Sequence, residues 1–392
     1  MVYKIMIKYS INKLLKRPNN ESPSTFLCSL KIAEVKKIKL KTLRDIARAG
    51  IIKEWSNAKD EVKKDENLYN RISEARMEKF VKLKPRFKMQ GSYVYGTIVT
   101  PAHPGQEIDL DDGMYIPMSV VMQDDKTMSS AMFEVVDKVL SKMASKQGWK
   151  QVSKHTCSRL QTNEGIHLDI PCYAIPDEDF SRLSINESKL GLDSLSLDSE
   201  LDMNTVNLAL RNGDWIESNP QHIHEWVIAA KQEHIYFQDI VKIVKGMRDH
   251  NYISGGPSSI SLMVAVENIM SSSPKLGSLT KEFQNVVQQL PNIISTQLNH
   301  PHPESQHLII HDPSELEKLE LRSKFDHFKS ILNSALIDAV TERESMDALI
   351  KLFGSRMPDD QSRIVRINHS EDDIPPNQTK FATPVQEHNT FG

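Results

Sequence analysis

Residues 90–113 read QGSYVYGTIVTPAHPGQEIDLDDG. The stretch joins a Gly-Ser pair, a segment of helical character and a strand in which Asp109 and Asp111 alternate with Ile108 and Leu110. Successive side chains of a strand point to opposite faces, so both carboxylates lie on one face and both aliphatic side chains on the other. Two like charges this close are costly unless a cation neutralises them, and a hydrated divalent metal ion is the commonest such partner. We therefore predict a metal site on this strand.

A third carboxylate follows on a later strand. In IHLDIP, residues 166–171, Asp169 alternates with aliphatic side chains as Asp109 and Asp111 do. Three aspartates from two neighbouring strands can hold two divalent ions about 3.5–4 Å apart, which activate an attacking hydroxyl and stabilise a departing phosphate. The pattern predicts phosphoryl or nucleotidyl transfer, with Asp109, Asp111 and Asp169 as catalytic residues and metal ligands.

The Gly-Ser pair supplies a second element of that chemistry. Gly91 permits a tight turn, and the backbone amides and the Ser92 hydroxyl at the start of a helix can hold a phosphate. Each motif is weak by itself, because a Gly-Ser pair and an Asp-x-Asp triplet both occur by chance. The alternative for Asp109 and Asp111 is a solvated strand face that leads into a turn at Asp112-Gly113.

The composition limits the classes of protein to which the chain can belong. A chain of 392 residues predicts two to three structural units. It contains 39% hydrophobic and 26% charged residues, and no apolar run is long enough to span a bilayer. The first residues lack a signal-peptide pattern and the three cysteines form no disulfide framework, so we expect a cytoplasmic protein without a membrane partner. The net charge of −3 argues against a protein that wraps nucleic acid.

The patterns predict an α/β (α+β) fold: a mixed sheet flanked by helices, followed by a helical C-terminal lobe. Strands are expected at 86–90, 107–117, 150–155, 158–162 and 166–176, and helices at 58–84, 127–147, 220–250, 258–272, 279–290 and 313–354. The Ser- and Asp-rich residues 177–206 read as a long excursion between the lobes. The predicted units are a basic helical segment packing on the core (1–57), a catalytic lobe (58–206), a nucleotide-binding helical lobe (207–355) and a flexible tail (356–392).

Several segments together resemble one family, the bacterial cGAS/DncV-like nucleotidyltransferases, whose sheet is of the polymerase-beta type. Within that family they are most similar to the DncV-type cyclic GMP-AMP synthases. The resemblance covers about residues 60–355. It rests on PRFKMQGSYVYGT (85–97), HPGQEIDLDDGMYIPM (103–118), HLDIPCYAIP (167–176), NLALRNGDWIESNP (207–220) and GGPSSISLM (255–263).

The resemblance implies an enzyme that joins two nucleoside triphosphates, ATP and GTP, into a linear and then a cyclic dinucleotide, 3',3'-cyclic GMP-AMP. The product would be a second messenger in antiphage (CBASS) defence, read by a downstream effector. Asp109, Asp111 and Asp169 would be ligands of two Mg²⁺ ions, with Mn²⁺ as an alternative. No DNA activator is implied, and we expect a monomer.

The resemblance also implies nucleotide contacts. Gln90, Gly91, Ser92 and Tyr95 match the phosphate-proximal loop, with Tyr95 stacking on a base or sugar, or alternatively packing on its helix face. The other matching positions are Arg159, Lys245, Ser259, Ser218, Asn219 and Ser305.

Two departures concern base specificity. Ser218-Asn219-Pro220 stands where the family commonly has Ser-Asp-Pro, and an amide cannot accept both N–H donors of a guanine edge as a carboxylate does. The segment LNHPHPESQHLIIH (298–311) lacks the expected acidic run, for which Glu304 or Ser305 can substitute. Its histidines carry no cysteine at ligand spacing, so we expect no zinc site among them.

The chain ends in Gly392. Many synthases of the family are joined through their C-terminal residue to a target by ubiquitin-transfer-like E1/E2 partner enzymes, and a flexible tail with a terminal glycine suits that role. Two other functions stay open at this point. One is a simpler nucleotidyltransferase that modifies a drug, an RNA or a protein, and the other is an inactive interaction module conjugated through its C-terminus.

Overall fold

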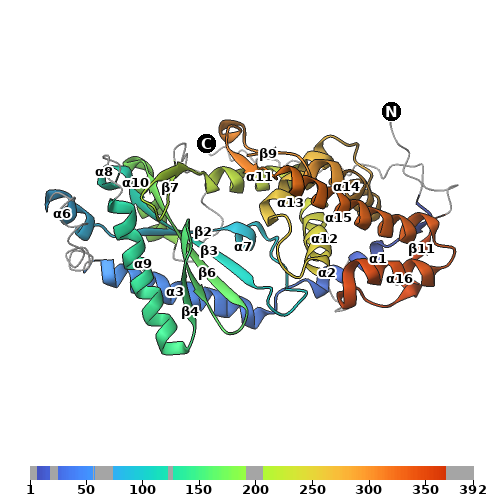
Figure 1. Cartoon of the computed structure of the whole chain (residues 1–392), viewed down its shortest axis with the longest axis horizontal. Helices are drawn as coiled ribbons and strands as arrows, with labels where there is room; N and C mark the ends of the chain where they lie inside the picture. The colour runs from blue at the N-terminus through green and yellow to red at the C-terminus, as the bar shows by residue number, and fades with distance from the viewer. Residues whose placement is uncertain are drawn as a thin grey trace, which may run out of the picture.

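The computed structural model describes residues 7–17, 25–55, 57, 74–121, 127–190 and 206–367. Figure 1 shows two lobes side by side: a sheet covered by two long helices, and a bundle of helices. Within the described residues, no helix combines the length and the apolar character needed to cross a membrane.

The sheet of the first lobe has seven strands and is mixed, as predicted. Its main path runs β2-β3-β6-β5-β4, with β3 and β6 parallel and the other neighbours antiparallel. The central strand β6 is buried along its whole length and has neighbouring strands on both edges. The bounds are β2 (Arg86–Gln90), β3 (Ile108–Pro117), β4 (Lys150–Ser153), β5 (Cys157–Gln161) and β6 (Ile166–Ile175).

Two helices cover one face of this sheet, α3 (Glu34–Trp55) and α9 (Thr127–Gln147). Leu110 and Leu168 of the strands pack with apolar side chains of both helices in one buried cluster. Because alternate residues of a strand point to opposite faces, Asp109, Asp111 and Asp169 lie on the other face.

The lobe boundary differs from the prediction. Strand β7 (Asn207–Ala209) pairs with β6, and β8 (Trp215–Glu217) pairs with β7, so residues 207–217 belong to the sheet and not to the helical lobe. The predicted excursion at 177–206 begins with a helix, α10 (Asp177–Leu190), which three acidic residues in its first turn favour. Residues 191–205 lie outside the described part.

The helical lobe surrounds a second apolar core. The predicted helical stretch 220–250 is two helices, broken around His234, and 313–354 also contains two. The bounds are α11 (Pro220–Glu233), α12 (Phe237–Asn251), α13 (Ser259–Ser271), α14 (Leu279–Ile294), α15 (Glu315–Asn333) and α16 (Glu342–Phe353). A short hairpin, β9 (Leu298–Asn299) and β10 (Ile309–His311), precedes α15 and encloses the 3₁₀ turn η2 (Pro303–Ser305).

Both ends of the described chain belong to the helical lobe. Strand β1 (Tyr9–Ser10) pairs with β11 (Val365–Arg366), and α1 (Asn12–Leu15) and α2 (Phe26–Ser29) contribute to the lobe's core. The predicted segment 1–57 therefore divides between two lobes, since α3 packs on the sheet. The predicted tail begins too early: residues 356–367 are part of the fold. The predicted helix at 58–84 is described only for α6 (Glu74–Lys82), and Gly392 lies outside the described residues.

Candidate active site

The three predicted aspartates meet on the open face of the sheet. Asp111 of β3 and Asp169 of β6 are direct partners across the parallel pair, and Asp109 lies one pleat earlier beside His167. Asp169 and Asp111 are largely buried, whereas the Asp109 side chain is 48% exposed. The site therefore has a closed end and one carboxylate at its mouth.

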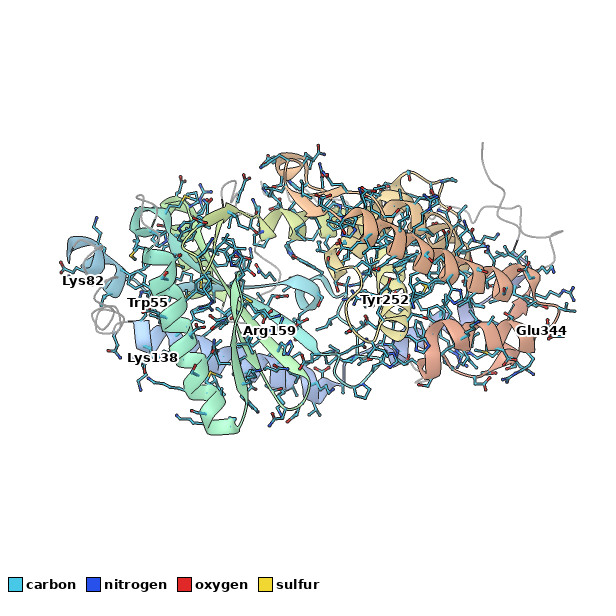
Figure 2. The ribbon with its side chains drawn as sticks, in the orientation of Figure 1. Trp55, Lys82, Lys138, Arg159, Tyr252 and Glu344 are labelled. Atoms are coloured by element: carbon cyan, nitrogen blue, oxygen red, sulfur yellow. The ribbon has the colours of Figure 1, made fainter. Side chains whose placement is uncertain are left out.

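Arg159 of β5 is the cation of this cluster. Its Nε and Nη2 donate to the two carboxylate oxygens of Asp169, both at 2.6 Å, and Nη2 lies 3.2 Å from Asp109 Oδ1. Figure 2 labels Arg159 on the sheet side of the molecule. Burial, together with the charges of Asp169 and Asp109, raises the pKa of Asp111 to about 7. Within the described residues Asp111 forms no ion pair, and Arg159, two strands away, pairs with Asp169 and Asp109 instead.

Gly91 adopts a conformation that only glycine accepts easily. Its φ of 75° lies in the left-handed region, and a Cβ atom here would lie 2.1 Å from Asp111 Oδ2. The turn between β2 and α7 (Gly91–Tyr95) therefore passes directly over the Asp111 carboxylate. This contact connects the Gly-Ser motif physically to the aspartates.

A cavity of about 460 Å³ opens beside Asp109 and is lined by Ser92, Lys245 and Ser259, all three predicted to contact nucleotide. Lys245 of α12 is buried, and its Nζ donates to the Thr97 carbonyl at 2.8 Å. Burial, with a contribution from the Arg248 charge, lowers the pKa of Lys245 to about 7. A bound triphosphate would favour the charged form of this lysine.

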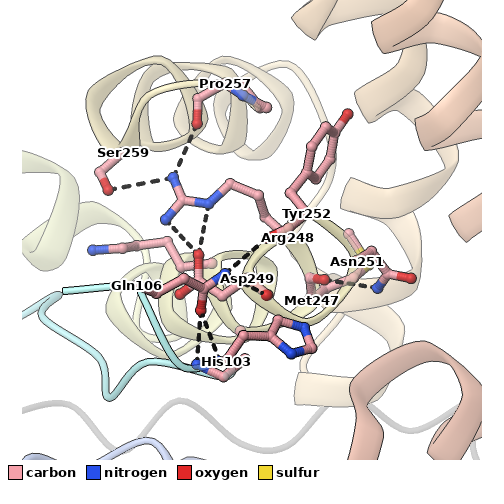
Figure 3. Close-up of polar contacts among 12 residues, drawn as sticks. His103, Gln106, Met247, Arg248, Asp249, Asn251, Tyr252, Pro257 and Ser259 are labelled. Carbon is pink, nitrogen blue, oxygen red and sulfur yellow. Dashed lines mark hydrogen bonds and ion pairs between the residues drawn. The ribbon is translucent and has the colours of Figure 1, made fainter. Parts of the chain in front are cut away.

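Arg248 is a cavity-lining residue that was not predicted from the sequence. Its guanidinium bonds Asp249 Oδ1 at 2.6–2.8 Å, the Pro257 carbonyl at 2.9 Å and Ser259 Oγ at 3.5 Å (Figure 3). It thereby holds the Gly-Gly-Pro turn against α12. The signal was available, because Arg248 follows Lys245 by three residues and so shares its helix face.

His167 was also missed. Its Nδ1 lies 3.0 Å from Asp109 Oδ1 and its Nε2 faces the Glu107 carboxylate. It precedes Asp169 by two residues on the same strand, so it shares a face with that aspartate. His167 and Arg159 both contact Asp109 Oδ1 and together position this carboxylate.

Gln90 and Tyr95 have structural roles. Gln90 Nε2 donates to the Tyr173 hydroxyl at 2.8 Å, which anchors the end of β2 to β6. The Tyr95 ring is buried in the core of the helical lobe, and burial raises the pKa of its hydroxyl. The structure thus favours the packing alternative for Tyr95 over stacking on a nucleotide.

The predicted base contacts gather elsewhere, around His222 of α11. The Asn219 side chain caps α11 by accepting from the His222 N–H at 3.2 Å, and the buried Ser305 Oγ lies 2.7 Å from His222 Nδ1. Ser218 is half-buried, with its N–H bonded to the Val206 carbonyl. None of the three is among the residues that line the 460 Å³ cavity.

The aspartate cluster fits a divalent metal. Hard oxygen ligands lie on adjacent strands, and burial with two neighbouring carboxylates raises the pKa of Asp111, an effect that a bound cation would oppose. Asp109, Asp111 and Asp169 are the residues that would hold Mg²⁺.

Comparison with known proteins identifies the family of this chain. Residues 85–173 match the model for the nucleotidyltransferase domain of cyclic GMP-AMP synthase DncV-like proteins, and residues 234–366 match that for the cyclic GMP-AMP synthase C-terminal domain. A cyclic GMP-AMP synthase of Vibrio cholerae is 34% identical over 316 residues, which are 74% of this chain and 71% of that protein. The chain belongs to the DncV-like nucleotidyltransferase family. It is accordingly a nucleotidyltransferase.

Solved structures of DncV-like enzymes share the whole architecture. The crystal structure of Vibrio cholerae DncV with the linear intermediate 5' pppA(3',5')pG has a TM-score of 0.77 at 26% identity, covering 93% of this chain and all of that one. The same enzyme with nonhydrolyzable GTP has a TM-score of 0.75 at 26% identity, covering 92% of this chain and all of that one. Both lobes of this DncV-like chain therefore have counterparts in enzymes crystallised with nucleotides.

Proposed function

We propose that this enzyme joins two nucleoside triphosphates into a cyclic dinucleotide at Asp109, Asp111 and Asp169. The observation that carries the proposal is the opening of a nucleotide-sized cavity at Asp109, with Lys245 and Ser259 on its helical-lobe side. The names of the relatives support ATP and GTP as substrates and cyclic GMP-AMP as the product. The 3',3' linkage of the product rests on the family resemblance.

The acidic and the basic residues of the site have different roles. Bound Mg²⁺ would lower the pKa of the attacking ribose hydroxyl and neutralise charge on the phosphates. Asp109, Asp111 and Asp169 would hold the metal at the reacting atoms. Lys245 supplies a buried positive charge to the triphosphate. Arg159, now paired with Asp169 and Asp109, is placed to contact a phosphate once a metal ion shares those carboxylates.

The two lobes together enclose the cavity in which the reaction would take place. The turn at 254–259 comes from the helical lobe, and Asp109 comes from the sheet, so the cavity lies where the two lobes meet. A site built from both sides can hold a linear intermediate while its second bond forms. Conjugation through Gly392 by E1/E2-like enzymes and a role in CBASS antiphage defence belong to the same proposal, and both rest on the family resemblance.

Product analysis tests the proposed activity. The purified chain is incubated with Mg²⁺ and each single or paired set of ATP, GTP, CTP and UTP, the mixture is treated with phosphatase, and mass spectrometry identifies what survives. We expect a cyclic dinucleotide, with the highest yield from ATP plus GTP. Phosphatase-sensitive linear products alone would favour a simpler nucleotidyltransferase, and no product with any pair would favour the inactive interaction module.

A further inference from the structure

A cluster of imidazole and carboxylate groups lies between α11 and the segment 298–311. His222 and Glu225 stand one helical turn apart on α11, so they share a face of the helix. His302 reaches them from the residue before η2. A potential ligand atom of each of the three residues lies within 4.8 Å of the other two. Such mutual distances suit a single metal ion surrounded by its ligands.

Neighbouring residues orient these ligands. Ser305 Oγ lies 2.7 Å from His222 Nδ1, which turns His222 Nε2 toward the cluster. Gln221 Nε2 donates to Glu225 Oε1 at 2.8 Å, and Oε2 faces His302 Nε2 at 3.5 Å. Metal-binding histidines and carboxylates usually have such outer hydrogen bonds, which fix the tautomer and the orientation of the ligand.

The packing of the rings sets what binding requires. The rings of His222 and His302 are stacked, with 4.0 Å between centroids and 19° between planes, so one ring has to rotate before the in-plane lone pairs of both Nε2 atoms point to one ion. Glu304 Oε2 lies 3.6 Å from His222 Nε2, close enough to serve as a fourth ligand. Binding through His302 Nε2 would break one long contact of 3.4 Å, from the Glu304 N–H to His302 Nδ1.

We propose that His222, Glu225 and His302 form a zinc site that fastens the segment 298–311 to α11. Two imidazole nitrogens and a carboxylate oxygen are ligands that Zn²⁺ accepts in a four-coordinate site, with Glu304 or water as the fourth ligand. The site lies apart from the aspartate cluster, and none of its three ligands is among the residues that line the 460 Å³ cavity. The proposal departs from our sequence-based expectation of no zinc site, because two of the ligands come from α11 and not from the loop.

The site has a structural consequence. His222 also donates its backbone N–H to the Asn219 cap, and Ser305 bonds its ring, so two of the three predicted base-contacting residues are attached to one zinc ligand. Zinc bound here would hold Asn219 and Ser305 in fixed relative positions. The order of the segment 298–311 should then depend on the metal.

A zinc titration tests the proposal on the full chain. Zn²⁺ is titrated against a chromophoric chelator with Mg²⁺ in large excess, so that Mg²⁺ occupies the aspartates. We expect one tightly bound zinc ion per chain. Glu225→Gln and His302→Gln should each weaken it at least about tenfold. His307→Gln is the matched control, because His307 lies on the same segment but is exposed and faces Glu217, and it should bind zinc as the wild type does.

Hydrogen exchange gives a second measurement. Zinc should slow amide exchange in residues 298–311 of the wild type and of His307→Gln, and have no effect in Glu225→Gln. Circular dichroism confirms that each variant is folded. The proposal is overturned if the wild type binds no zinc under these conditions, or if Glu225→Gln and His302→Gln bind it as tightly as the wild type.

Discussion

Asp111 and Asp112 are adjacent in the chain, yet β3 points their side chains to opposite faces of the sheet. Asp112 is fully buried and paired with Arg48 of α3 through bonds of 2.7 and 2.5 Å. Asp111 is on the face of Asp109 and Asp169, and burial, together with the charges of those two residues, raises its pKa to about 7. One residue thus stabilises the fold, and the other carries a charge whose cost a bound cation would relieve.

Gly91 tests whether the turn must pass over Asp111. Gly91→Ala introduces a Cβ atom 2.1 Å from Asp111 Oδ2, so the carboxylate has to move. A displacement of about 1 Å can cost about a hundredfold in rate, and we expect a loss of that size in kcat/KM for dinucleotide synthesis.

Gly148→Ala is the matched control. Gly148 has a similar φ of 66° but nothing within 4 Å of its Cβ position. Both variants should lose about 1–2 kcal/mol of stability from left-handed strain, and only Gly91→Ala should lose activity. Equal activity of the two variants would contradict the assigned role of the turn.

Lys245 predicts a pH dependence of stability. Its pKa is lowered to about 7 in the fold, whereas an unfolded lysine titrates near pH 10.4. Between these values the unfolded chain binds a proton that the folded chain does not, so the Lys245 contribution to stability rises with pH across this window. Below pH 7 both states are protonated, and the full cost of burying the charge remains.

Lys245→Met removes this titration. Without nucleotide, denaturant unfolding at several pH values from about 7 to about 10 should show a smaller rise in unfolding free energy with pH for Lys245→Met than for the wild type. Parallel pH profiles of the two proteins would show that Lys245 is not buried as described.

At the scale of elements, α3 is fastened to the sheet by a buried ion pair and an apolar seam. Arg48 and Asp112 are 9% and 0% exposed, and Arg48 also lies over the Phe87 ring at 5.5 Å. Breaking a buried pair by removing one partner costs about 3–5 kcal/mol, because the other charge stays buried. The same helix carries an exposed pair, Lys39 with Glu164, at the turn before β6.

The contributions of these two ion pairs to stability can be compared by mutation. Asp112→Asn should lower the unfolding free energy by about 3–5 kcal/mol. Glu164→Gln should lower it by about 1 kcal/mol or less, since exposed pairs contribute little. Urea denaturation measures both, and a similar small loss in the two variants would mean that the pair with Arg48 does not hold α3 on the sheet.

The elements also show which parts of the fold can be predicted from the sequence. Strand positions in the sheet follow from local alternation, so β2 to β6 and the shared face of Asp109 and Asp111 were predictable. The pairing of β7 with β6 and of β11 with β1 was not, because both join segments far apart in the chain. Burial of Tyr95 and the approach of His302 to α11 also depend on tertiary packing, which no local pattern encodes.

At the scale of the whole molecule, the N-terminal segment links the two lobes. Residues 7–15 lie in the core of the helical lobe, and α3 then runs back along the sheet. Arg356 adds a contact by donating to the carbonyls of Thr100 and Gly246 at 2.9 and 2.6 Å. These connections hold the lobes around the cavity at Asp109, where two nucleotides have to meet.

The most direct test of the central claim is the yield of phosphatase-resistant dinucleotide from ATP and GTP by Asp169→Asn and by Asp338→Asn. Asp338 is an exposed aspartate on the helical lobe, so its replacement controls for the loss of one carboxylate. We predict that Asp338→Asn makes as much product as the wild type, and that Asp169→Asn stays folded but makes no detectable product. Product formation by Asp169→Asn at a rate near that of the wild type would contradict the assignment of the active site.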